Sequence, residues 1–267
     1  MSNIEWYEEG SVLIVTLSDS ENGNLLNIDS LSGLKEILSH ASAEKNRAIV
    51  IRSNGKNFCL GMDLKFLETH SENLQIAEKA IKLYSDLLVE LFHSPVPVIC
   101  LVNGSVKAGG IGLMGAGDII IASENSDFEL TEVLFGLVPF NVLPFIYSQR
   151  LAPKKAQNLI ITARKLTACE ALAIGLIDEV FSETEIEKGV KSIIKNILRS
   201  SPEAISETKR FCSSMNGTLF AESIESARAN LLNLLQNGNV LNAVKAFSEG
   251  DLPEWFSQFK PKKPLVL

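Results

Sequence analysis

Two glycine-rich segments carry the residues whose types and spacing suit catalysis. Asn54–Asp63 (NGKNFCLGMD) and Asn103–Asp118 (NGSVKAGGIGLMGAGD) each follow an apolar run that predicts a buried strand, and each leads into a predicted helix. Glycine at such a junction leaves backbone N–H groups unpaired. Two of these donors can hold one developing oxyanion, and we assign that role to the N–H groups of Met62 and Gly109. Each loop alone also fits an ordinary strand-to-helix turn, so the interpretation depends on their joint occurrence.

Short motifs follow one another in a set order along nearly the whole chain. They are Asn24–Asn27, Phe58–Asp63, Asn103–Gly104 with Ala108–Gly110, Asp118, Phe128–Gly136, Gln149–Leu151, Leu166–Ala168 and Gly175–Asp178. As an ordered set they resemble the crotonase, or enoyl-CoA hydratase/isomerase, superfamily. The resemblance implies an α/β fold, a crotonase-like spiral of ββα units with a helical C-terminal segment used in trimerisation. It also implies acyl thioester substrates activated by an oxyanion hole.

The chain departs from this family at one of its two acidic positions. Family hydratases use two glutamates, and the first of them falls at Gly112 here. The second is kept as Glu132, preceded by Thr131 where the family has proline. Because nothing at position 112 can hold or activate water, water addition by two carboxylates is disfavoured and Glu132 remains as a single acid/base. Three apolar residues are expected to surround it and raise its pKa, namely Phe135, Leu137 and Phe140.

The segment after Glu132 is bulky where family hydratases tend to be glycine-rich. Together with KAGGIGLMGAGD, the stretch LTEVLFGLVPFNVLPF (130–145) resembles the 3-hydroxy-3-methylglutaryl-acyl-carrier-protein dehydratases of polyketide β-branching. This implies a lyase of polyketide or antibiotic biosynthesis that dehydrates a carrier-bound 3-hydroxy-3-methylglutaryl thioester to the 3-methylglutaconyl thioester. Two alternatives stay open, an acyl-CoA hydratase or enoyl-CoA isomerase of fatty-acid metabolism and a non-catalytic crotonase-fold binding protein. We expect no cofactor beyond the phosphopantetheine or CoA that carries the acyl group.

Further residues near the two loops are candidates for the site. Asp63 follows the oxyanion donor, and it either reaches into the site as a catalytic residue or caps the helix that begins at Leu64. Lys107 suits a distal substrate carboxylate or, as a lysine in a turn, solvent. Tyr84 either lines the pocket or belongs to the core of its helix. The substrate-binding residues that we expect are Leu60, Gly61, Gly110, Lys107, Phe140, Asn141 and Tyr84.

The composition limits the class of protein. The chain has 267 residues, a formal net charge of −7 and a sequence pI near 5.2, with no basic stripe to neutralise phosphates, which argues against nucleic-acid binding. Three widely spaced histidines offer no metal site. Four dispersed cysteines, an acidic N-terminus and the lack of an apolar run of roughly 20 residues predict a soluble cytoplasmic protein without a membrane partner.

Apolar periodicity predicts alternating strands and helices over the first half of the chain. Ile4–Glu8 and Val12–Leu17 form a predicted hairpin, and Asp29 or Ser30 caps the first helix. Later elements include a helix of small residues over Ala108–Gly117. All-apolar strands are expected at Ala48–Arg52, Val98–Val102 and Ile119–Ala122.

From about residue 144 the pattern predicts helices alone. We divide the chain into a catalytic core at 1–200 and a helical trimerisation segment at 201–267. A C-terminal helix carries an apolar stripe with little chain left to cover it, which predicts a homotrimer or hexamer. The stripe consists of Phe220, Ile224, Ala227, Leu231 and Leu235.

Overall fold

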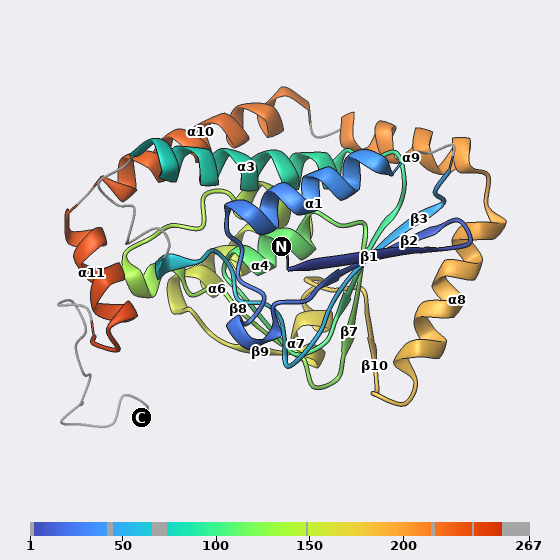
Figure 1. The fold of residues 1–267 in the computed structure, drawn as a ribbon, viewed down its shortest axis with the longest axis horizontal. Coiled ribbons are helices and arrows are strands. Elements are labelled where there is room, and N and C mark those ends of the chain that lie inside the picture. The colour runs from blue at the N-terminus through green and yellow to red at the C-terminus, as the bar shows by residue number, and fades with distance from the viewer. Residues whose placement is uncertain are drawn as a thin grey trace.

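The computed structural model describes residues 3–41, 45–65, 74–147, 149–214, 217–236 and 238–252 (Figure 1). The strands are β1 (Ile4–Glu9), β2 (Val12–Leu17), β3 (Ala48–Ser53), β4 (Asn57–Cys59), β5 (Val98–Val102), β6 (Ser105–Lys107), β7 (Ile119–Ser123), β8 (Asp127–Glu129), β9 (Leu166–Thr167) and β10 (Glu179–Phe181). The helices are η1 (Ser20–Asn22), α1 (Ile28–His40), α3 (Leu74–Phe92), α4 (Gly109–Gly115), η2 (Glu132–Phe135), α5 (Leu143–Ile146), α6 (Pro153–Thr162), α7 (Ala168–Ala173), α8 (Ile186–Arg199), α9 (Pro202–Ser214), α10 (Gly217–Leu235) and α11 (Gly238–Ser248).

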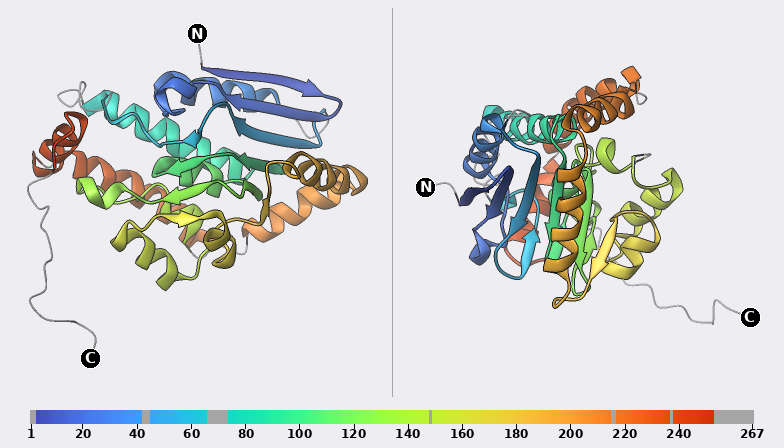
Figure 2. Two further views of the ribbon diagram at one scale, coloured as in Figure 1. Left: turned by 90° about the horizontal axis from the view of Figure 1, so that it is seen from below. Right: turned by 90° about the vertical axis from the view of Figure 1, so that its right-hand side faces the viewer.

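A six-stranded sheet in the order β1-β2-β3-β5-β7-β10 forms the base of the fold. The predicted hairpin is confirmed, because β1 pairs antiparallel with β2 and Gly10 turns between them with φ of +59°. The other neighbours pair in parallel. Helix α8 lies over one face of the sheet in the right-hand view of Figure 2, and its apolar side chains pack on that face, while the main core lies on the other. Because both faces of the large sheet are buried, its inner strands are continuous apolar runs in the sequence.

Three successive ββα units build the centre of the molecule. The units are β3–β4–α3, β5–β6–α4 and β7–β8–η2, and the second strand of each joins a smaller sheet in the order β4-β6-β8-β9. In this sheet β4, β6 and β8 are parallel, whereas β9 is antiparallel to β8. The predicted spiral of ββα units is therefore confirmed. As a consequence of this spiral, the adjacent parallel strands β4, β6 and β8 all end at the same edge of the small sheet.

Two aspartates of the ordered motifs tie strands of the large sheet together. The carboxylate of Asp118 accepts a hydrogen bond from Val98 N–H at 2.7 Å, and that of Asp178 accepts one from Ile120 N–H at 2.7 Å. Arg150 reaches Asp178 at 3.1 Å, so this motif is also structural. The motifs that contain Asp118 and Asp178 therefore stabilise the spiral and do not belong to a site.

Two predictions about element boundaries are wrong. Helix α1 is capped by Asn27, not by Asp29 or Ser30, because the Asn27 side chain accepts from Ser30 N–H while the Ser30 hydroxyl accepts from Asn27 N–H. The expectation of helices alone after residue 144 fails because β9 and β10 follow it. Both strands are very short and add to the edges of existing sheets, so they leave little periodicity in the sequence.

The apolar stripe on α10 is covered by the chain itself. Helix α10 runs beside α3 in Figures 1 and 2, and the rings of Phe220 and Phe92 stack with centroids 4.8 Å apart. Ile224 and Ala227 are buried in the same way. The reason that we gave for an oligomer is therefore wrong, and a trimer or hexamer stays a prediction of the resemblance alone.

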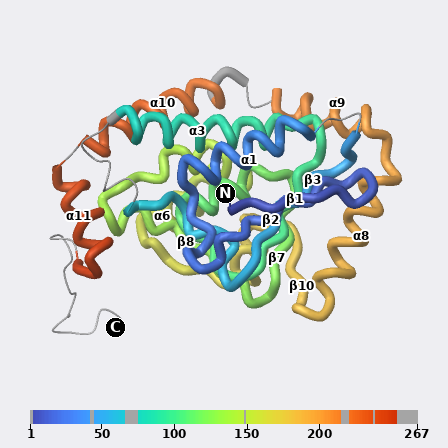
Figure 3. The backbone as a smooth tube through the Cα atoms, in the orientation of Figure 1, coloured from blue at the N-terminus to red at the C-terminus, as the bar shows by residue number. Residues whose placement is uncertain are grey.

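The C-terminal helices end next to η2. Helices α8 and α11 occupy opposite ends of the molecule in Figure 3, and the apolar residues of α11 pack with Phe135 and Leu137. Within the described ranges, no helix has both the length and the apolar character that crossing a bilayer requires.

Candidate active site

The candidate site lies where three parallel strands of the small sheet end. Met62 follows the end of β4, Gly109 follows the end of β6 and Glu132 follows the end of β8. In α/β folds the carboxyl ends of parallel strands form the usual ligand-binding edge. The register of the small sheet thus brings together three residues that are up to 70 positions apart in the chain.

Glycines let the loops after β4 and β6 approach each other closely. A Cβ on Gly61, whose φ is +92°, would lie 3.0 Å from Gly109 N, and a Cβ on Gly110 would lie 2.2 Å from the Cys59 carbonyl oxygen. Neither position tolerates a side chain without displacing backbone. At Gly109 the nearest atoms would be at ordinary contact distances, including Met62 N at 3.5 Å. A small side chain at Gly109 would thus fit without displacing backbone, so space alone does not require glycine there.

The N–H of Met62 points away from its neighbouring segment. Met62 bridges Leu26 in parallel, with Leu26 N–H donating to the Gly61 carbonyl at 2.8 Å and Asp63 N–H donating to the Leu26 carbonyl at 2.9 Å. In this pattern the N–H of the middle residue faces the other side. It finds no acceptor among the residues that the structure describes. The motif Asn24–Asn27, to which we assigned no role, thus orients the donor.

The N–H of Gly109 also has no acceptor among the described residues. Gly109 is the first residue of α4, where an N–H has no acceptor within the helix. Before it, Ala108 adopts φ of +45° and ψ of −120°, which is uncommon for any residue except glycine. The Ala108 N–H donates to the Glu129 carbonyl at 3.0 Å, so β8 holds this strained residue in place. Strain of this kind gathers at functional sites, but the sequence shows no sign of it.

Glu132 is the only buried carboxylate in the described part of the chain. Its side chain is 9% exposed, and Oε2 has no hydrogen-bond partner. Burial raises the pKa of Glu132 to about 7, while a hydrogen bond from its own backbone N–H acts in the opposite direction. The expected rise is confirmed. A carboxyl with this pKa can accept and return a proton near neutral pH.

Tyr84 and Gly112 meet beside the start of α4. The Tyr84 hydroxyl, which comes from α3, donates to the Gly109 carbonyl oxygen at 2.6 Å. A Cβ on Gly112 would lie 2.2 Å from the same hydroxyl oxygen. Tyr84 therefore both belongs to the core and contacts the candidate site, two interpretations that the sequence left as alternatives.

Asn141 carries an unsatisfied amide. It is 4% exposed, and neither its Nδ2 nor its Oδ1 has a hydrogen-bond partner within the described ranges. Its neighbour Val142 lies close to Gly112, with 3.1 Å between Val142 Cγ2 and the place of a Gly112 Cβ. Buried polar groups are nearly always paired, so an amide left over at this place suits a ligand group. Phe140 is half-buried beside it.

The remaining candidates are placed less close to the reacting groups. Lys107 forms an ion pair with Glu129 at 3.0 Å, so its charge already has a protein partner. The Leu60 side chain lies against Gly23, where a Cβ would be 2.5 Å from Leu60 Cδ1. Asp63 is half-buried and directly precedes the helical residue Leu64, which fits the interpretation as a helix start.

The thiol of Cys59 is buried next to the loop. It accepts a weak hydrogen bond from Gly61 N–H at 3.5 Å, and burial raises its pKa to about 12. The group is thus a neutral thiol near pH 7 and packs as a small apolar residue. Among the described residues, no three His, Cys, Asp or Glu side chains gather as metal ligands do.

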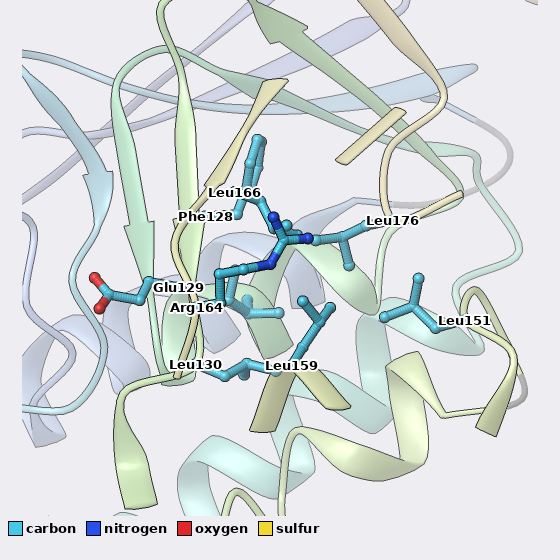
Figure 4. A pocket seen from close by; sticks show the side chains of 9 residues that line it. Phe128, Glu129, Leu130, Leu151, Leu159, Arg164, Leu166 and Leu176 are labelled. Carbon is cyan, nitrogen blue, oxygen red and sulfur yellow. The ribbon is translucent and has the colours of Figure 1, made fainter. Parts of the chain in front are cut away.

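A small pocket next to the site is separate from it. The pocket in Figure 4 is apolar apart from Glu129 and Arg164, and residues of α4 and β8 are among those that line it. None of Met62, Gly109 and Glu132 lines it. We therefore do not assign the reaction to this pocket.

Comparison with known proteins supports the resemblance to the enoyl-CoA hydratase/isomerase family. The sequence profile of the family described as Enoyl-CoA hydratase/isomerase matches residues 7–258. The mitochondrial enoyl-CoA hydratase domain-containing protein 3 of Danio rerio is 30% identical over 250 residues, which cover 93% of this chain and 86% of that protein. The bacillaene synthase dehydratase PksH of Bacillus subtilis (strain 168) is 28% identical over 253 residues, covering 94% of this chain and 95% of that protein.

The fold agrees with solved structures over almost its full length. A crystal structure of an enoyl-CoA hydratase from Mycobacterium avium matches with a TM-score of 0.85 and 25% sequence identity, covering 96% of this chain and 100% of that one. The family match covers well over half of the chain, and the shared fold extends over almost all of it. The chain therefore belongs to the enoyl-CoA hydratase/isomerase family and is an enzyme of that family.

Proposed function

We propose that this enzyme removes water from a 3-hydroxy-3-methylglutaryl thioester on an acyl carrier protein and gives the 3-methylglutaconyl thioester. The observation that carries the proposal is the single buried carboxylate, Glu132, with a pKa of about 7 beside two unpaired backbone N–H groups. Position 112, where the resemblance puts a second glutamate in hydratases, is glycine and is blocked by Tyr84. The site is thus built for proton transfer by one carboxylate.

The elimination follows from these groups. The N–H groups of Met62 and Gly109 receive the thioester oxygen and stabilise the enolate that forms when the α-proton leaves. One such donor is typically worth roughly 10²–10³ in rate. Glu132 takes the α-proton as a base, and if elimination is syn it returns that proton to the departing β-hydroxyl. One C–H bond and one C–O bond break, the C=C bond forms, and water leaves. The reaction is redox-neutral and is proposed to need no cofactor beyond the carrier of the thioester.

The substrate class is supported by similarity and by the shape of the site. PksH of Bacillus subtilis is called a dehydratase of bacillaene synthesis, and this chain is similar to it over most of both lengths. The bulky segment 138–145 adds the buried Asn141 amide, which suits a polar group on the acyl chain. An acyl carrier protein is the partner that this substrate requires. A cytoplasmic location is proposed with it, supported by four unpaired cysteines.

A second candidate is an enoyl-CoA isomerase of fatty-acid metabolism. One glutamate is enough to move a proton between two carbons, so the single Glu132 fits that reaction as well. The substrate then distinguishes the two proposals, because an isomerase acts on an acyl-CoA without a leaving hydroxyl.

The experiment compares turnover of three thioesters by the purified enzyme. The proposal expects efficient dehydration of carrier-bound 3-hydroxy-3-methylglutaryl thioester and poor turnover of crotonyl-CoA and 3-enoyl-CoA. Efficient hydration of crotonyl-CoA contradicts it, and turnover of 3-enoyl-CoA alone supports the isomerase. If no thioester is turned over, or if Glu132→Gln leaves every measured activity unchanged, the remaining interpretation is a binding protein.

A further inference from the structure

Tyr84 reaches the candidate site from α3. The residue is 3% exposed on α3, and its hydroxyl donates to the carbonyl oxygen of Gly109 at 2.6 Å. Gly109 is the first residue of α4 and supplies one of the two N–H groups assigned to the oxyanion hole. The Tyr84 hydrogen bond therefore restrains a residue whose orientation matters for catalysis under the proposed function.

The space over Gly112 is already filled by the same hydroxyl. A Cβ at Gly112 would lie 2.2 Å from Tyr84 Oη, 3.1 Å from Val142 Cγ2 and 3.3 Å from Leu88 Cδ1. The backbone of Gly112 is helical and has no positive φ, so its conformation does not call for glycine. The absence of a side chain there is explained by Tyr84, and the two residues form a matched pair.

We propose that Tyr84 is a positioning residue, whose hydroxyl holds the first turn of α4 so that the Gly109 N–H meets the thioester oxygen. The proposal rests on the proposed function in one respect, since it takes Met62 and Gly109 as the donors to that oxygen. It adds that the pair of Tyr84 and Gly112 replaces the hydratase glutamate with a neutral donor that points at backbone. Glu132 is consequently the one residue of the site that transfers a proton.

The electrostatic surroundings keep the Tyr84 hydroxyl protonated. Burial raises the pKa of Tyr84 well above its usual value, and the nearby Cys59 and Glu132 raise it further. A hydroxyl that stays protonated while Glu132 titrates remains a donor to Gly109 at every working pH. Tyr84 is thus unsuited to deliver a proton, and its effect on rate is exerted through Gly109.

The first experiment removes only the hydroxyl. Tyr84→Phe keeps the ring in the core, and the Gly109 carbonyl still has the N–H of the next helical turn as a donor, so the variant is expected to fold. We expect kcat to fall on the order of 10- to 100-fold with little change in KM, because a small misplacement of a catalytic group is enough for such a loss. Tyr7→Phe, at an exposed tyrosine on β1, is the matched control and should keep wild-type kcat.

A spectroscopic measurement separates positioning from a merely structural role. In infrared difference spectra of bound [1-¹³C]crotonyl-CoA, the thioester C=O stretch moves to lower frequency when N–H groups polarise it. We expect a smaller shift in Tyr84→Phe than in the wild type and in Tyr7→Phe. Wild-type kcat together with an unchanged carbonyl frequency would overturn the proposal. The probe is a general acyl thioester, so this result does not depend on which substrate proves to be natural.

The second experiment needs no substrate at all. Gly112→Ala should lower the urea midpoint of unfolding strongly in the wild type, since the new methyl group meets the hydroxyl oxygen. In the Tyr84→Phe background the same substitution should lower it much less. Equal losses in both backgrounds overturn the pairing. This cycle is informative even if the carrier-bound thioester is not a substrate, so failure of the proposed function and failure of this inference are distinguishable.

Discussion

Phe247 near the end of α11 lies against Phe135 of η2, with 4.2 Å between the ring centroids. Phe135 is buried, whereas Phe247 is 49% exposed and forms the outer layer of this contact. Since Glu132 is the first residue of η2, the pair joins the C-terminal helix to the short helix that carries the proposed acid/base. We therefore expect the C-terminal segment to affect both the position of Glu132 and its separation from water.

Phe247→Ala tests this connection. The substitution should lower the free energy of unfolding by about 0.5–1.5 kcal/mol through the aromatic pair. By admitting water to η2 it should also move the pKa of Glu132 down toward its ordinary value, which the pH profile of kcat/KM reports. Phe211→Ala, at a 64% exposed phenylalanine on α9, is the control and should leave the profile unchanged. An unaltered profile in Phe247→Ala contradicts the connection.

Glu132→Gln tests the single proton carrier. The substitution keeps the volume and removes the basic form, so kcat should fall by roughly 10²–10⁴ with substrate binding little changed. Asp63→Asn, at the half-buried helix start, should mainly lower stability. If Asp63→Asn abolishes turnover in a folded protein while Glu132→Gln does not, the proton carrier lies on the other wall of the site. Turnover of the natural thioester and circular dichroism measure the two effects.

The raised pKa of Glu132 makes stability depend on pH. Between pH 4.5, the usual value for the residue, and pH 7 the unfolded chain has released this proton while the folded protein still holds it. Stability contributed by the protonated carboxyl is therefore complete below pH 4.5 and is lost as pH rises to about 7. Glu132→Gln should not lose this stability, because glutamine has no titratable carboxyl group. Above pH 7 the variant should exceed the wild type in free energy of unfolding by up to roughly 3 kcal/mol, and the difference should vanish near pH 4.

Urea unfolding at several pH values measures that difference directly. A constant difference across this pH range would show that the Glu132 pKa is not raised in the folded protein. Together with the kcat measurement, the expected result is a variant that is less active and more stable.

Asn141→Leu tests the unsatisfied amide. Because neither amide atom has a partner within the described residues, replacing the side chain by an apolar one of similar size should raise the free energy of unfolding by about 1–3 kcal/mol. The KM for the natural thioester should increase, since the ligand loses its partner. Asn24→Leu is the contrast, because the Asn24 amide donates to two carbonyls at 2.8 and 3.1 Å and that variant should lose stability. Lower stability of Asn141→Leu with unchanged KM contradicts the assignment.

Docking of an acidic carrier protein requires a basic patch on a chain whose formal net charge is −7. Arg164 and Lys165 are paired with Glu170 and Asp127, and a further cluster of basic residues in the sequence, Lys260, Lys262 and Lys263, lies outside the described residues. Lys154 and Lys155 are exposed at the start of α6 and are the better candidates.

Reversing both charges, Lys154→Glu with Lys155→Glu, should raise KM for the carrier-bound substrate and spare a small thioester mimic. The control is Lys188→Glu with Lys195→Glu, at exposed lysines of α8. Equal effects on carrier-bound and small substrates would exclude docking as the cause. Steady-state kinetics with both substrates make the comparison.

The sequence by itself determined the ordered motifs, the hairpin and the all-apolar strands β3, β5 and β7. It did not predict the short strands β4, β6 and β8, which lie next to or within segments interpreted as turns and loops. The hairpin and the apolar strands leave a local pattern of apolar periodicity and turn residues, whereas the close approach at Gly61 and Gly110 joins distant segments. Glu132 was found in the same way, because its motif and its apolar neighbours are contiguous in the chain.

Only the tertiary structure decided how distant residues pair. The hydroxyl of Tyr84 over Gly112, the ion pair of Lys107 with Glu129 and the burial of the α10 stripe on α3 all join segments that the sequence keeps apart. A stripe of apolar residues has the same sequence pattern whether it faces another chain or the core of its own chain. A tyrosine at helical spacing likewise has the same pattern in a core and in a site. Packing resolves such cases, since the contacts across the fold decide which face is covered.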